Sequence, residues 1–420
     1  MLRIRQERIT HDLASLSKIG RSGRHAVTRL AFTGPEDAAF LHMAKRMRDA
    51  GLDVRVDSFG NLYGRFEGRD KNANPVLVGS HIDTVRQGGR FDGTAGVVAG
   101  LEAIRAIGEA GHKPAKPIEL VVFRGEESSR FGKALLGSKA ATGQLSENDL
   151  DTIGRPMASL GHLFKTRGQG AQKTTPLDAS NTHAYLELHI EQGKMLELAG
   201  KQVGVVTEIA APVRYELSFK GQADHSGATP MGKDRSDALV AAAKTAVAAE
   251  KYAKRENRAA WLPGRKGMVV ATMGKMDVPE GSMNTVPGSV EALLDIRGTN
   301  LKKRGRAEKR ILGAARDAAA KRGVLLQETR KEHQTPVKVS KRLADDIARA
   351  CTEEKITFMK MPSGAGHDAV SLSQAGIPVG MIFVPSKKGI SHAAEEYTAP
   401  RDIAAGTAVL ARALLSIANK

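Results

Sequence analysis

The chain has few aromatic residues, a single cysteine and no long apolar run. Phe, Trp and Tyr make up 4% of its 420 residues, and none of the recognised nucleic-acid-binding motifs is present. Cys351 alone cannot form an intramolecular disulfide, which is typical of proteins in a reducing compartment. No stretch reaches the roughly 18 apolar residues of a membrane span, and the N-terminal residues lack an apolar signal core. We therefore expect a cytoplasmic protein that binds neither nucleic acid nor a membrane.

Basic residues are in excess, and the formal net charge is +18. They concentrate in residues 251–267 and 301–310. Nucleic-acid binding is one interpretation, but the shortage of aromatic residues argues against it. Solvated helix faces, with some attraction for anionic substrates, explain the charge better. The charge alone does not identify the function.

The first half of the chain, and the segment near its C-terminus, alternate between helical and strand-like patterns. Residues 36–49 place apolar positions at helical spacing, and a helix rich in small residues is expected from Thr94. The apolar runs 118–123, 184–190 and 379–384 are typical of strands that are covered on both faces. Strands that alternate with helices predict an open α/β sheet.

Residues 212–332 follow a different order. Their pattern is strand–helix–strand–strand–helix–strand, the ferredoxin-like split arrangement. Every metal-type residue described below lies outside this segment. The sequence therefore predicts a discontinuous catalytic domain, residues 1–211 and 333–420, with a second domain inserted at 212–332.

Five metal-type side chains lie just beyond strand-like runs: His81, Asp92, Glu127, His189 and His392. Their contexts read GSHIDTV, GRFDGTAG, RGEESSRFG, YLELHIEQG and GISHAAEE. In an open α/β sheet, ligands bind beyond the carboxyl ends of the strands, so separate segments bring these groups to one edge. Three imidazoles and two carboxylates are what two zinc-like ions need when they share a bridging carboxylate. Any one of these histidines alone would be interpreted as structural; their convergence favours a metal site.

A sixth group, Glu126, directly precedes Glu127. Neighbouring side chains in an extended segment point apart, so the two carboxylates are not expected to bind one ion together. One can ligate a metal while the other takes a proton from water whose pKa the metal lowers to about 7. The alternative interpretation is a solvated acidic turn. Asp83, two residues after His81, is placed to hydrogen-bond that imidazole and orient it.

These segments resemble the M20 metallopeptidase-like amidohydrolases. The resemblance is strongest to their hydantoinase/carbamoylase branch, which includes N-carbamoyl-L-amino acid hydrolases, allantoate amidohydrolases and β-ureidopropionases. It rests on GSHIDTVRQGGRFDG, EESSRFGKALLGS, ELHIEQGKMLE, ADHSGATPMGKDRSDAL, NTVPG with DIRG, and SGAGHDA with MIFVPSKKGISHAAEEYT. It implies a metallopeptidase-like catalytic domain with a mixed sheet flanked by helices. It also implies that the inserted ferredoxin-like α+β domain serves as a lid and as the interface of a homodimer.

The resemblance also implies a ligand set for two divalent ions. One ion would be held by His81, Asp92 and His189, and the other by Asp92, Glu127 and His392. Asp92 would bridge the two. Zinc suits this mixture of nitrogen and oxygen ligands, with manganese, cobalt or nickel as alternatives.

The remaining roles implied by the resemblance concern catalysis and the substrate. Glu126 would be the general acid and base. His225 would polarise the scissile carbonyl, often from the partner subunit of a dimer. Further contacts to the substrate and its carboxylate would come from Gln192, Asn284, Arg297 and Gly366. From the residues alone, a plain turn residue is the favoured interpretation of His225 and a surface charge that of Arg297; the match to the family motifs reverses this.

The activity implied is hydrolysis of the linear amide or ureido bond of a small anionic N-carbamoyl or N-acyl L-amino acid by a metal-activated hydroxide. Allantoate amidohydrolase and β-ureidopropionase are alternatives within the branch, and a dipeptidase or aminoacylase is a more distant one. A non-catalytic binding protein is a third possibility, against which the complete ligand set argues. Ala211-Pro212 and the form ADHSGATPM depart from the commoner motifs and indicate a subgroup with its own substrate.

Overall fold

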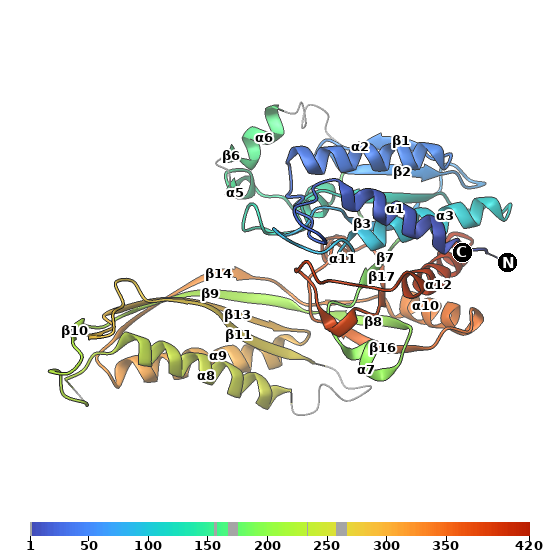
Figure 1. The fold of residues 1–420 in the computed structure, drawn as a ribbon. Helices are drawn as coiled ribbons and strands as arrows, with labels where there is room; N and C mark the ends of the chain where they lie inside the picture. The colour runs from blue at the N-terminus through green and yellow to red at the C-terminus, as the bar shows by residue number, and fades with distance from the viewer. Residues whose placement is uncertain (1, 155–157, 167–174, 233, 258–266) are drawn as a thin grey trace. The chain divides into compact units, whose positions relative to one another are not determined.

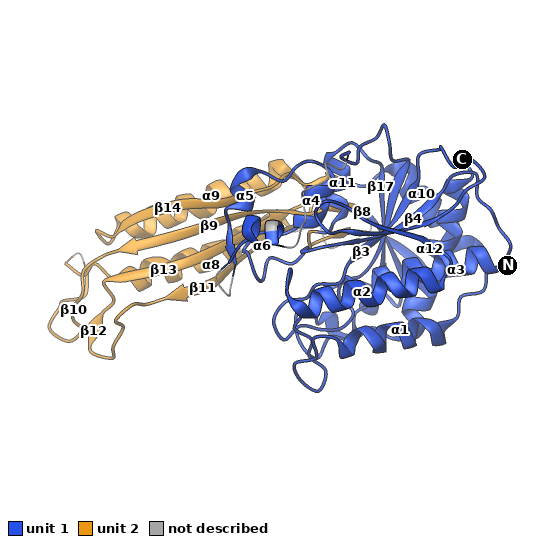
Figure 2. Ribbon diagram, turned by 90° about the horizontal axis from the view of Figure 1, so that it is seen from above, with its two compact units in different colours: residues 1–207, 339–361, 367–420 blue, residues 208–338, 362–366 orange. Residues whose placement is uncertain are grey.

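The computed structural model describes residues 2–154, 158–166, 175–232, 234–257 and 267–420. The chain divides into two compact units, coloured separately in Figure 2. Unit 1 comprises Met1–Thr207, Val339–Met361 and His367–Lys420, and unit 2 comprises Glu208–Lys338 and Pro362–Gly366. Unit 2 thus begins before residue 212 and ends after residue 332, and it takes in a short segment near the C-terminus that the sequence did not assign to it.

The main sheet has nine strands in the order β1-β2-β4-β3-β7-β17-β8-β15, with β16 paired to β8. Strands β4, β3, β7 and β17 run parallel in its centre, and the flanking pairs are antiparallel, so the sheet is mixed as expected. The strands are β1 (Asp53–Val56), β2 (Leu62–Phe66), β3 (Val76–His81), β4 (Ile118–Phe123), β7 (Ala184–Ile190), β8 (Val203–Ile209), β15 (Val337–Lys338), β16 (Phe358–Ser363) and β17 (Val379–Val384).

The four central strands are buried along their whole length, which explains their continuous apolar runs. Helices α3 and α12 pack on each other and against β3, β7 and β17, and α1 and α10 extend this layer (Figure 1). The helices are α1 (Gln6–Lys18), α2 (Gly34–Asp49), α3 (Thr94–Glu109), α4 (Leu136–Ala141), α5 (Glu147–Leu150), α6 (Leu160–Thr166), α7 (Met195–Ala199), α10 (Lys341–Glu353), α11 (Ala369–Gln374) and α12 (Pro400–Ala418). A small two-stranded sheet joins β5 (Ile153–Gly154) to β6 (Ala158–Ser159).

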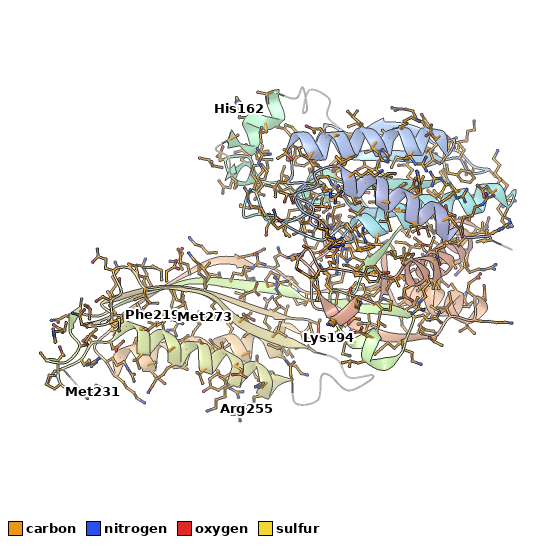
Figure 3. All side chains as sticks on the ribbon, viewed as in Figure 1. His162, Lys194, Phe219, Met231, Arg255 and Met273 are labelled. Atoms are coloured by element: carbon orange, nitrogen blue, oxygen red, sulfur yellow. The ribbon has the colours of Figure 1, made fainter. Side chains whose placement is uncertain are left out.

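Unit 2 is built on a four-stranded antiparallel sheet in the order β11-β13-β9-β14. Its elements are β9 (Ala211–Lys220), β10 (Asp224–His225), α8 (Ala238–Glu256), β11 (Val269–Asp277), β12 (Thr285–Val286), β13 (Ser289–Gly298), α9 (Leu301–Ala320) and β14 (Leu325–His333). Helices α8 and α9 cover one face, and Phe219 and Met273 belong to the core beneath them (Figure 3). The basic stretch 251–267 begins on α8, and its residues 258–266 lie outside the described part of the chain.

No helix among the described residues is both long and apolar enough to span a bilayer.

Candidate metal centre

The parallel strands of unit 1 deliver the predicted ligands to one edge of the sheet. His81 is the last residue of β3, and His189 is the penultimate residue of β7. Glu127 follows β4, and His392 lies in the loop after β17. The carboxyl ends of parallel strands meet at the same edge, so segments distant in sequence converge there.

Asp92 lies in the middle of this convergence, in the loop before α3. Its Oδ1 is 3.1 Å from Nε2 of His189 and 3.7 Å from Nε2 of His81. Its Oδ2 is 3.3 Å from Nε2 of His392, and the same Nε2 is 3.2 Å from Oε1 of Glu127. The two carboxylate oxygens of Asp92 therefore face two different groups of donors.

The donor atoms form two groups that could each hold a metal ion. One is His81, Asp92 and His189, and the other is Asp92, Glu127 and His392; within each group the donor atoms lie within 4.8 Å of one another. Imidazole nitrogens and carboxylate oxygens suit zinc and other divalent transition metals. The side chains present thus fit two ions that share Asp92. All of these residues are buried except His392, whose side chain is 50% exposed and leaves one side open to solvent.

Gly93 allows Asp92 to approach His81. Its φ is +61°, and a Cβ atom at this position would lie 2.4 Å from Nε2 of His81. Its N–H points at Nε2 of His189, at 3.2 Å. Any side chain at residue 93 would therefore displace an imidazole of the centre.

Asp83 holds the segment that carries both glutamates. Its Oδ1 accepts the backbone N–H of Glu126 at 3.1 Å, and its Oδ2 accepts that of Glu127 at 3.0 Å. Nδ1 of His81 lies 3.1 Å from the Asp83 carbonyl oxygen and 3.4 Å from its Oδ1. Because Nδ1 faces Asp83, Nε2 of His81 is left to face the donor group. Asp83 thus contacts His81, as expected from the sequence, and in addition fixes the backbone of the two glutamates.

Glu126 lies beside the centre but in neither donor group. Its Oε2 is 3.9 Å from Nε2 of His81. Burial raises the pKa of the Glu126 carboxyl well above its usual range; the charge of His81 opposes the shift, and Glu127 and Asp368 add to it. A carboxyl that is close to both candidate donor groups but in neither of them is suited to proton transfer.

The loops after β7 and β17 close the other side of Asp92. The side-chain amide of Gln192 donates to Asp92 Oδ2 at 2.7 Å, and the hydroxyl of Ser391 donates to the same oxygen at 2.9 Å. Glu396 accepts the N–H groups of Phe91 and Asp92 at 2.9 and 3.0 Å. Burial, followed by the charge of Asp92, raises the pKa of Glu396 to about 7, although the hydrogen bonds to its carboxylate oppose the shift. Gln192, expected at the substrate, contacts the central carboxylate in this structure.

Sequence reasoning did not single out Ser391 and Glu396, although both stand within the quoted segment GISHAAEE. It also missed His367, whose ring packs against that of His189 with centroids 4.5 Å apart. His367 forms a third buried donor group with His189 and Glu187. Glu187 and His189 are polar residues inside the apolar run AYLELHI, and this pattern was the signal that could have revealed the third group.

Comparison with known proteins identifies the family. The model of Peptidase family M20/M25/M40 matches residues 77–416. The chain belongs to this family. It is 38% identical to the N-carbamoyl-L-amino acid amidohydrolase of Geobacillus stearothermophilus, over 99% of each chain. It is 32% identical to the allantoate amidohydrolase of Bacillus subtilis, over 98% of this chain and 97% of the relative.

A solved structure of the hydantoinase/carbamoylase branch is also similar to this protein over its whole length. It is an amidase from Burkholderia multivorans, with a TM-score of 0.90 and 33% identity, and the match covers 100% of this chain and 99% of that one. The family and branch predicted from the sequence motifs are therefore confirmed.

The substrate-binding residues that the sequence predicts in segment 212–332 lie in two places within unit 2. His225 on β10 pairs with Thr285 on β12, and the N–H of Ser226 donates to the Asn284 carbonyl oxygen at 2.9 Å. His225 and Asn284 thus lie together, whereas Arg297 stands at the opposite end of β13. Gly366 belongs to the short C-terminal segment of this unit.

The hydrogen bonds of His225 define its tautomer. Its Nδ1 accepts the backbone N–H groups of Gly227 and Ala228 at 3.2 and 3.1 Å. A neutral ring with an accepting Nδ1 carries its proton on Nε2. The exposed side of His225 therefore presents a hydrogen-bond donor.

Proposed function

We propose that this M20 protein is a binuclear metal-dependent amidohydrolase acting on a linear amide or ureido bond of a small N-carbamoyl or N-acyl L-amino acid. The observation that carries the proposal is the position of Asp92, whose two oxygens face the two donor groups. The similarity to an N-carbamoyl-L-amino acid amidohydrolase supports the substrate class. Allantoate amidohydrolase activity is the alternative that a second relative favours.

Two divalent ions at the centre would be held by His81, Asp92, Glu127, His189 and His392. When bound, such ions lower the pKa of water and polarise a carbonyl oxygen. Zinc is proposed, because imidazole and carboxylate ligands suit it, and manganese, cobalt and nickel are the alternatives.

Glu126 is proposed as the general base and then the general acid. It would take a proton from the attacking water and return it to the departing nitrogen. Asp83 fixes the backbone of Glu126, so the carboxyl group is held beside His81. For a carbamoyl substrate the products are the amino acid, carbon dioxide and ammonia.

Unit 2 is proposed to supply the groups that bind the substrate. The Nε2–H of His225 would donate to the oxygen that becomes negative in the transition state. Arg297 would hold the substrate carboxylate, for which a guanidinium offers a planar fork. Asn284 lies with His225, away from Arg297, so it would reach the same carboxylate only from the partner subunit. Gln192 and Gly366 would complete the contacts.

We also propose that unit 2 is a lid and forms a homodimer interface in a cytoplasmic enzyme. The exposed apolar side chains of Met231 and Met283 near His225 and Asn284 support a protein contact there, because large apolar groups rarely face water together. Mixed dimers of His225→Ala and Glu126→Gln chains should recover activity if His225 acts across subunits. Confirmed heterodimers without recovery would contradict a shared site.

A hydrolysis screen tests the substrate class directly. Protein stripped of metal is given zinc, manganese, cobalt or nickel in turn, and each form is assayed with N-carbamoyl, formyl and acetyl amino acids, allantoate, ureidopropionate and dipeptides. Fastest turnover of an N-carbamoyl amino acid is expected. Cleavage of dipeptides alone would overturn the proposal in favour of a peptidase.

A further inference from the structure

The face of the unit 2 sheet that helices α8 and α9 leave uncovered carries Arg297. Along β13, Val290, Ala292, Leu294 and Ile296 are buried in the core, so the alternate residues Leu293, Asp295 and Arg297 point to the other face. Asp295 is paired with Arg214 on β9 and with Thr272 on β11. Arg214, Asp295 and Arg297 therefore lie next to one another on a single face.

Four charges of alternating sign cross three strands on this face. Glu332 on β14 accepts a hydrogen bond from Nη1 of Arg214 at 2.7 Å. Nε of Arg214 donates to Oδ2 of Asp295 at 3.0 Å. Asp295 in turn accepts from Nε of Arg297 at 3.1 Å and from its Nη2 at 3.1 Å. The row Glu332–Arg214–Asp295–Arg297 ends on the arginine that the proposed function assigns to the substrate carboxylate.

Sharing Asp295 affects how strongly Arg297 attracts an anion. The contacts with Asp295 use Nε and Nη2 of Arg297 and, among the described residues, leave Nη1 for another acceptor. Arg214 also donates a hydrogen bond to the Asp295 carboxylate, so the negative charge of Asp295 is shared between the two arginines and neutralises Arg297 only in part. Without Arg214, Asp295 would pair only with Arg297 and would compete more strongly with an incoming carboxylate.

The row borders a hollow that can hold a small anion. Its volume is about 560 Å³, and its lining includes Arg214, Asp295, Arg297, Lys331, Val270 and Leu293. A lining that combines cations with aliphatic side chains suits a carboxylate with a short organic substituent.

We propose that Arg214 is a positioning residue for substrate binding, acting through Asp295 to present Arg297 to the carboxylate of an amino-acid-derived substrate. This inference rests on the proposed function, since it needs a substrate carboxylate at Arg297. Arg214 itself is not required to touch the substrate.

The experiment compares KM and kcat of Arg214→Gln, Arg214→Lys and Arg297→Gln with the wild type, on the N-carbamoyl amino acid that the wild type hydrolyses fastest. Arg214→Gln should raise KM about tenfold and leave kcat within about twofold, because ground-state binding and not chemistry is weakened. Arg214→Lys should restore part of the affinity. Arg316→Gln is the matched control, since Arg316 also pairs with a carboxylate in unit 2, Glu328, but does not line the hollow.

Two further readouts separate positioning from general damage. The substrate's carboxamide analogue, used as a competitive inhibitor, should keep its Ki in Arg214→Gln. In a double-mutant cycle, Arg214→Gln should have little further effect on KM once Arg297 is Gln. Equal loss for the acid and the amide, or independent effects of the two substitutions, would overturn the inference. Wild-type protein without activity on any N-carbamoyl or N-acyl amino acid would instead overturn the proposed function.

Discussion

The carboxylate of Asp83 accepts the backbone N–H of Glu126 at 3.1 Å, and its other oxygen accepts the next N–H along the chain at 3.0 Å. One buried side chain thus fixes the backbone of the proposed proton carrier and that of a proposed metal ligand. Asp83→Asn offers one accepting oxygen in place of two. We expect metal affinity or kcat to fall by about 10- to 100-fold, as for other residues that orient ligands. Metal content and kcat check this, and wild-type values for both would contradict it.

Glu126 and Glu127 should respond differently to the same substitution. Glu126→Gln removes the group that carries the proton but no donor of either metal group, so kcat should fall by about 10²- to 10⁴-fold with metal content unchanged. Glu127→Gln weakens the group formed by Asp92, Glu127 and His392, so one equivalent of metal should be lost. Elemental analysis beside kinetics separates the two. Loss of metal in Glu126→Gln would contradict the division of roles.

Gly93→Ala should damage the centre more than a glycine substitution elsewhere. The added Cβ would meet His81 at 2.4 Å, and φ is +61°. Gly111→Ala is the matched control, since its φ is +74° and nothing lies within 4 Å of the added atom. Both variants place a side chain at a positive φ, which L residues rarely adopt. Only Gly93→Ala should also lose metal affinity. Equal metal affinity in the two variants would mean that the site tolerates a methyl group at residue 93.

The Asp12 carboxylate should make stability depend on pH. It is buried and joins Arg46 on α2 to Arg105 on α3. Burial would raise its pKa, but hydrogen bonds and charge attraction from Arg105 and Arg46 outweigh this and lower the pKa below its usual value. A lowered folded-state pKa gives stability that is present above the unfolded-state pKa, about 4, and is lost as the pH falls through the folded-state value.

Urea unfolding of wild type and Asp12→Asn, both in chelator, tests this dependence. At pH 7 the variant should be less stable by about 3 kcal/mol, because it breaks a buried ion network. The difference should shrink below about pH 4 as Asp12 is protonated. Asp49→Asn, at an exposed pair with Lys45, should lower the stability far less than Asp12→Asn does. A pH-independent difference for Asp12→Asn would refute the linkage.

Much of unit 1 could be predicted because burial on both faces leaves a direct mark on the sequence. The runs 118–123, 184–190 and 379–384 are the observed strands β4, β7 and β17. The place of His81, a candidate ligand at the end of a strand, could be predicted for the same reason. The spacing of residues does not show how a loop folds back, so the contacts of Ser391 and Glu396 with the Asp92 segment could not be foreseen.

Contacts that depend on the register of paired strands could not be predicted from the sequence either. Asp295 and Arg297 are two residues apart, and their common face was predictable from strand alternation. Arg214 joins them only because β9 pairs with β13 in one particular register. The closeness of His225 and Asn284 depends in the same way on the pairing of β10 with β12.

The most direct test of the account is a zinc titration of chelator-treated protein, followed by ammonia release from an N-carbamoyl L-amino acid. The account predicts negligible release without metal and a rise that levels off at two equivalents per chain, because Asp92 serves both donor groups. Full activity in chelator, or no release at any zinc, manganese, cobalt or nickel concentration, would contradict it.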